Sequence, residues 1–164
     1  EIDYLIECLT KIINQEDDSL IAVNNDQKIE NNKTASTVII DKFLNVKGWD
    51  SRHREIMLLG KKLERLDTNL RDDESLINGC ESLAWLVSSK TSQGIFHFKA
   101  DSDAKIIRGL LVIVLAAFNG KTADQIAEFD IKAYFERLGL MQHLSPSRGN
   151  GVLAIVNKIK SLIL

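Results

Sequence analysis

The chain has 164 residues, of which 45% are hydrophobic and 27% are charged, and its formal net charge is −2. This composition is ordinary for a globular domain, and the absence of a strongly basic run argues against nucleic-acid binding. The longest apolar run, 110–118, is too short to cross a bilayer, no secretory signal pattern opens the chain, and the two distant cysteines, Cys8 and Cys80, indicate a reducing, cytoplasmic setting rather than a disulfide scaffold.

Residues 1–13 predict a short amphipathic helix, because apolar residues recur there at three- and four-residue spacing. Residues 14–36 are rich in Asn, Asp and Glu, which predicts a polar linker. The apolar periodicity returns at residue 37, so we expect the folded domain to span 37–164.

Two helices are predicted at the start of this domain. The first has an apolar face around Ile39 and Phe43 and ends at Gly48. The second is expected to be capped by Asp50 or Ser51 and to contain Gly60 as a weak point. The polar stretch 67–74 then predicts a loop that leads to Cys80.

A β-hairpin is predicted next, with strands at 83–87 and 95–98 and turn residues between them. The cluster Asp101-Ser102-Asp103 is expected to cap the helix 104–118, which is apolar on nearly all sides and therefore belongs at the centre of the domain. Helix starts are expected at Thr122, Asp130 and Ser145-Pro146. Helices, then a small antiparallel sheet, then helices predict an α+β domain.

Cys80 is the best candidate for chemistry. It follows Gly79 where a polar loop gives way to an apolar run, and glycine allows the backbone to present a side chain at a loop tip or to swing. A free cysteine is also often just a small buried hydrophobic residue. The residues alone leave both interpretations open.

Four segments together resemble the SufE family of sulfur acceptors, over roughly 37–164. The first holds the cysteine, the second opens the apolar helix, the third opens the last helix, and the fourth lies upstream. The sequences are Gly79-Cys80-Glu81-Ser82-Leu83-Ala84-Trp85; Ser102-Asp103-Ala104-Lys105-Ile106-Ile107-Arg108-Gly109-Leu110; Leu138-Gly139-Leu140 with His143-Leu144-Ser145-Pro146-Ser147-Arg148-Gly149-Asn150-Gly151-Leu153; and Trp49 with Leu58-Leu59-Gly60-Lys61-Lys62-Leu63. In the third segment Val152 is inserted before the usual Leu.

This resemblance implies a SufE/NifU-like α+β fold and a function. SufE-like proteins accept sulfur as a persulfide from a SufS-type, pyridoxal-phosphate-dependent cysteine desulfurase and pass it on to an Fe–S scaffold for iron–sulfur cluster assembly. Cys80 would carry the sulfur by the motif match, and the domain would need no cofactor of its own. Residues 1–13 also resemble the C-terminal tail of such a desulfurase, and the chain begins without Met. We therefore expect the donor to act in trans or to be fused at the N-terminus.

Groups that would stabilise the Cys80 thiolate have to come from elsewhere in the fold. A free thiol has a pKa of roughly 8.5, and Glu81 beside it would disfavour the thiolate. Cationic help is expected from His143 or Arg148, or from the helix end after Ser145. Arg148 is the stronger candidate for partner contact.

Other residues of the motifs have two interpretations each. Gly79 supplies a hinge, and Ser82 shapes the strand. Asp103 could tune the cysteine loop or act as an ordinary helix-start carboxylate. Arg108 could line the partner surface or pair with an acid such as Asp103. Gly151 is expected to allow close packing.

Three other functions compete with this interpretation. A non-catalytic adaptor would bind and activate the desulfurase with an inert Cys80. A metal or cluster scaffold would need Cys80, His97, His143 and Asp103 to converge, although no Cys-x-x-Cys spacing supports it. A thiol redox enzyme would need a resolving cysteine nearby, and the sequence has none.

Overall fold

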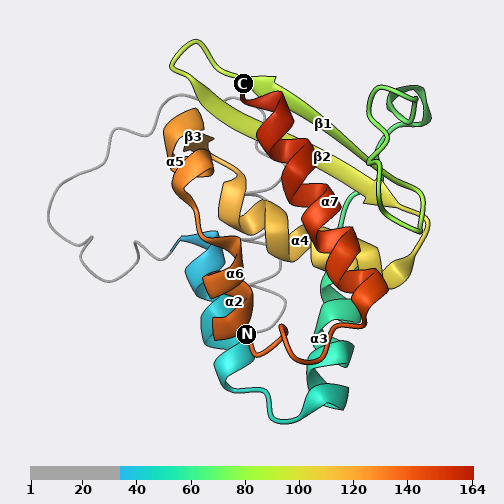
Figure 1. Ribbon diagram of the computed structural model, residues 1–164, viewed down its shortest axis with the longest axis vertical. Coiled ribbons are helices and arrows are strands. Elements are labelled where there is room, and N and C mark those ends of the chain that lie inside the picture. Colours follow the sequence, from blue (N-terminus) through green and yellow to red (C-terminus); the bar gives the residue numbers. More distant parts are fainter. Residues whose placement is uncertain (1–33) are drawn as a thin grey trace, which may run out of the picture.

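A computed structural model describes residues 34–164 (Figure 1). The predicted helix 1–13, with Cys8, and the predicted linker 14–36 as far as residue 33 lie outside the described residues. The elements are, in chain order, α2 (Ala35–Leu44), α3 (Trp49–Lys62), the 3-10 helix η1 (Thr68–Leu70), β1 (Ala84–Lys90), β2 (Ile95–Ser102), α4 (Lys105–Phe118), β3 (Lys121–Thr122), α5 (Ala123–Glu128), α6 (Ile131–Arg137) and α7 (Pro146–Leu162). A three-stranded antiparallel sheet with helices around it confirms the α+β prediction.

Most helix starts follow the predicted capping chemistry. The side chains of Thr122, Asp130 and Ser145 each accept a hydrogen bond from a backbone N–H in the first turn of α5, α6 and α7, as predicted. The predicted cap of α3 is wrong. That helix begins at Trp49 directly after Gly48, whose φ is 80°, so Asp50 lies inside the first turn.

The hairpin is longer than predicted. β1 pairs with β2 in antiparallel register from Ala84↔Ser102 to Lys90↔Phe96. Phe96 and Phe98 point into the core, as expected from the alternation of the strand. Because β2 continues to Ser102, the prediction that Asp101 and Ser102 cap the next helix is wrong. The N-cap position of α4 is Ala104, which makes no side-chain cap.

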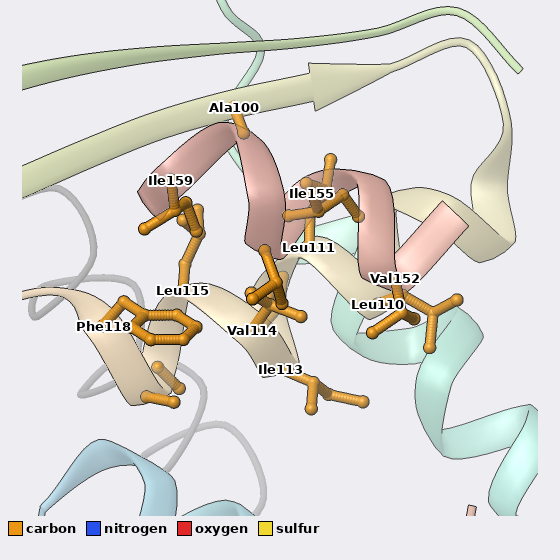
Figure 2. Packing of buried hydrophobic residues seen from close by; sticks show 14 of the residues in the cluster. Ala100, Leu110, Leu111, Ile113, Val114, Leu115, Phe118, Val152, Ile155 and Ile159 are labelled. Carbon is orange, nitrogen blue, oxygen red and sulfur yellow. The ribbon is translucent and has the colours of Figure 1, made fainter. Parts of the chain in front are cut away.

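Helix α4 forms the centre of the domain, as its apolar sequence predicts. Every residue from Ile107 to Phe118 is buried. Figure 2 shows its side chains packed against Val152, Ile155 and Ile159 of α7 on one side, with Ala100 of β2 nearby. Within residues 34–164, no helix has both the length and the apolar character required to span a membrane.

The two glycines of the α3–α4 crossing allow the helices to touch backbone to backbone. A β-carbon on Gly109 would lie 2.0 Å from the carbonyl oxygen of Ile56, and one on Gly60 would lie 2.7 Å from the nitrogen of Gly109. Gly60 was expected to be a weak point of α3. It is instead a point of close helix packing, and a side chain there would push the two helices apart.

Candidate functional site

The cysteine lies on a short loop that enters β1. The backbone N–H of Ile77 donates to the carbonyl of Ala84 at 2.8 Å and closes the base of this loop. Gly79 has a φ of 91°, a conformation that favours glycine, and it sets the turn before the thiol. Cys80 is half-buried, so its thiol is neither sealed in the core nor fully open to solvent.

The cysteine loop packs against one face of α7. A β-carbon built on Gly79 would lie 3.6 Å from the Cβ of Ala154, and one built on Gly151 would lie 3.5 Å from the Sγ of Cys80. The hydroxyl of Ser147 donates to Oε2 of Glu81 at 2.6 Å. Since 147, 151 and 154 are three or four residues apart, they share one helical face.

The same face of α7 also contacts the segment that leads into the cysteine loop. Lys158, one turn beyond Ala154, donates from Nζ to the carbonyl of Glu74. The segment 74–81 therefore runs antiparallel to α7, and the cysteine end of it meets the first turns of the helix (Figure 1).

The exit of the loop is tied to the start of α4. The carbonyl of Leu83 accepts two hydrogen bonds, from the Ser102 hydroxyl at 2.7 Å and from the backbone N–H of Asp103 at 3.1 Å. Asp103 thus contacts the cysteine segment through its main chain, while its side chain is exposed. Ser82, just before Leu83, is half-buried.

A buried charge cluster is centred on Asp101, the β2 residue directly opposite Trp85 of β1. Its carboxylate is fully buried and pairs with Arg108, with Arg71 at 2.8 Å and with Arg65 at 3.5 Å. It also accepts from the backbone N–H of Leu66 at 3.1 Å. Buried carboxylates require such compensation, because an unpaired charge in the interior is strongly unfavourable.

Arg108 belongs to the interior of the domain. It was expected either at a partner surface or paired with an acid such as Asp103, and it is buried and paired with Asp101. Its Nε donates to the carbonyl of Gly60 at 3.1 Å, and Nη2 donates to that of Leu63. Burial lowers the pKa of this guanidinium, and the Asp101 carboxylate opposes that shift.

Arg71 connects this cluster to the hairpin. While its Nη2 pairs with Asp101, its guanidinium carbon lies 5.4 Å from the centre of the Trp85 ring. Such cation–π contact favours one orientation of the indole. The motif tryptophan is therefore held on the same face of the hairpin as the Asp101 cluster, and it follows the buried Ala84 in β1.

His143 and Arg148 lie on the segment that leads into α7. The exposed ring of His143 stacks on Trp49, at the start of α3, with centroids 5.4 Å apart. Arg148 is the third residue of α7, and its backbone N–H donates to the capping hydroxyl of Ser145. Its guanidinium is half-buried and makes no hydrogen bond or ion pair with the residues that the structure describes.

The geometry gives no support to the metal-site alternative. Within residues 34–164, no group of three or more His, Cys, Asp or Glu side chains is arranged to hold a metal ion. The structure therefore does not bring together a metal site made of Cys80, His97, His143 and Asp103.

The sequence predicted Cys80 as the candidate thiol but not the contacts that surround it. The contacts of Glu81 with Ser147 and of Gly79 with Ala154 join residues more than sixty positions apart, and no local pattern predicts them. Asp101 was assigned to a helix cap. One available signal was the alternation of apolar residues in the sequence, at Phe96, Phe98 and Ala100, which extends the strand towards Asp101.

Fold and site together define a compact α+β domain with a half-buried thiol on a loop supported by a helix. Comparison with known proteins agrees. The pattern of the SufE family, described as an Fe–S metabolism associated domain, matches residues 37–163, and the chain belongs to this family. An uncharacterised SufE-like protein of Rhizobium meliloti (strain 1021) is 39% identical over 131 residues, which cover 78% of this chain and 94% of that protein. Membership associates the chain with iron–sulfur metabolism.

Proposed function

We propose that Cys80 accepts sulfane sulfur from a pyridoxal-phosphate-dependent cysteine desulfurase and stimulates that enzyme, in the cytoplasm. The sulfur would then pass to iron–sulfur cluster assembly. The observation that carries the proposal is the position of the thiol: half-buried, on a loop with a glycine hinge, within a SufE family match. The pyridoxal phosphate belongs to the donor, and this domain contributes the acceptor thiol.

The chemistry is thiol–disulfide exchange in form. The Cys80 thiol loses its proton, and the thiolate attacks the terminal sulfur of the persulfide on the donor cysteine. A new S–S bond forms on Cys80, the S–S bond of the donor breaks, and the donor cysteine leaves as a thiolate. No external oxidant or reductant is consumed.

The loop that carries the thiol, Arg148 and Arg108 have different roles in this proposal. Gly79 gives the loop its hinge, and the main-chain ties of Leu83 to Ser102 and Asp103 hold its exit in place. Arg148, with a guanidinium that is unpaired within the described residues, is proposed to contact the desulfurase. Arg108 is proposed to keep the fold rather than to meet the partner, because it is buried.

Intact mass spectrometry tests the proposal. The protein is incubated with a SufS-type desulfurase and cysteine, and we expect the mass to rise by one sulfur atom. A Cys80→Ser variant should gain none, whereas Cys8→Ser should gain the sulfur as the wild type does. A Cys80→Ser protein that still gained sulfur would overturn the proposal.

The adaptor alternative is separated by a second measurement. An adaptor with an inert cysteine would still stimulate the desulfurase after Cys80→Ala, whereas an acceptor would lose stimulation together with the thiol.

A further inference from the structure

The loop 78–82 that carries the thiol has few polar ties of its own. Its base is closed by the hydrogen bond between Ile77 and Ala84. Among the described residues, one hydrogen bond is made by a side chain of 78–82, and that is the bond between Glu81 and Ser147 of α7. The thiol of Cys80 has no hydrogen-bond partner in the described part of the chain.

We propose that the Glu81–Ser147 hydrogen bond is a clip that holds Cys80 close to Gly151 at rest and limits the reactivity of its thiol. The inference rests on the function proposed above and assigns positioning roles to Glu81 and Ser147. The clip is adjacent to the thiol in sequence. It is also one turn from Gly151 along α7. Breaking it would leave the cysteine end of the loop attached to the helix by van der Waals contact alone.

The clip is a favourable but modest interaction, so it can open reversibly. Ser147 is the second residue of α7, and a carboxylate near a helix N-terminus is favoured by the helix dipole. The bond is short, at 2.6 Å, yet exposed to solvent, so losing it changes the closed population only several-fold.

The test measures how fast Cys80 reacts with iodoacetamide, in a Cys8→Ser background and with no desulfurase present. Ser147→Ala breaks the clip and keeps the charge of Glu81. We expect alkylation about three- to tenfold faster than in the parent, the range for loss of one exposed charged hydrogen bond. Circular dichroism melting confirms that the variant is folded.

Two further variants separate position from charge. Glu81→Gln removes the carboxylate charge but keeps an oxygen that can accept from Ser147. At about pH 9.5, above the ordinary thiol pKa of about 8.5, it should react more slowly than Ser147→Ala. Ser161→Ala removes a hydroxyl near the other end of α7, where it donates to the carbonyl of Lys158, and should react as the parent does.

Equal alkylation rates for Ser147→Ala and the parent would overturn the clip. So would a Glu81→Gln protein that reacts as fast as Ser147→Ala at high pH, because charge alone would then explain the effect. Failure of the proposed function is a different result, namely no added sulfur after incubation with a desulfurase. The two ideas can therefore fail separately.

Discussion

Cys80 lies close to Gly151 of α7: a β-carbon on Gly151 would lie 3.5 Å from the Sγ of Cys80 and 3.5 Å from Cδ1 of Ile107. That separation is ordinary van der Waals contact. The seat of the thiol therefore has room for one methyl group and for little more.

The effect of substituting Gly151 on stability and on thiol reactivity should depend strongly on the size of the new side chain. Gly151→Ala should fold normally and gain up to about 1 kcal/mol in the free energy of unfolding, because alanine is favoured inside a helix. Gly151→Leu should lose about 1–3 kcal/mol through overpacking and should displace the thiol, so that alkylation of Cys80 accelerates. Urea unfolding and iodoacetamide kinetics measure the two effects, and a Gly151→Leu protein with unchanged thiol reactivity would show that the seat is wrongly described.

Removal of the Asp101 charge should be among the most destabilising changes in the domain. Asp101→Ala leaves Arg108 buried without its partner, for which we expect a loss of about 3–5 kcal/mol in the free energy of unfolding. Asp103→Ala, two residues away, removes an exposed carboxylate and should cost about 0.5 kcal/mol or less. Equal losses for the two variants in urea titrations would contradict the assignment.

The α3–α4 crossing predicts opposite outcomes for two Gly→Ala changes. Gly109→Ala places a β-carbon 2.0 Å from the Ile56 carbonyl oxygen, so the helices must separate, and we expect a loss of about 3 kcal/mol or insoluble protein. Gly149→Ala, in α7 with no neighbour within 4 Å of the new carbon, should be neutral or stabilise by up to about 1 kcal/mol. Thermal melting of both variants checks the contrast.

Asp72 should contribute to the acid sensitivity of the fold. The backbone N–H of Ser75, at 2.8 Å, and then the Ser75 hydroxyl lower the pKa of Asp72 below its ordinary value of 3.8. A carboxyl with a lower pKa in the folded state adds stability above the unfolded value, and this is lost as the pH falls through the folded value. Asp72→Asn should therefore flatten the fall in stability below about pH 4, measured by urea unfolding at several pH values. Above about pH 6 the two curves should run parallel, and divergence there would point to another cause.

Local chemistry was sufficient to predict the fold class and most helix starts. Thr122, Asp130 and Ser145 each cap a helix because their side chains reach backbone N–H groups only a few residues away. Gly48 shows the limit of such reasoning. The start of α3 depends on a glycine at positive φ, and the polar residues after it were a plausible but wrong cap.

The candidate site was predictable in its thiol and not in its support. Asn119 illustrates the same limit in the core. It follows the last residue of α4, and its side-chain oxygen accepts from the backbone N–H of Phe98 at 2.7 Å, a contact across 21 positions. Such long-range contacts depend on how elements pack, and a single sequence carries no local signal for them.

The tight crossing of α3 and α4 also couples positions that look independent. Arg108 reaches the carbonyl of Gly60 only because Gly60 and Gly109 let the two main chains approach. A bulkier residue at either glycine would also pull that carbonyl away from the guanidinium, so the three positions should show strong epistasis. A substitution at any one of them would be tolerated only together with compensating substitutions at the other two. The three positions should therefore change together during evolution or not at all.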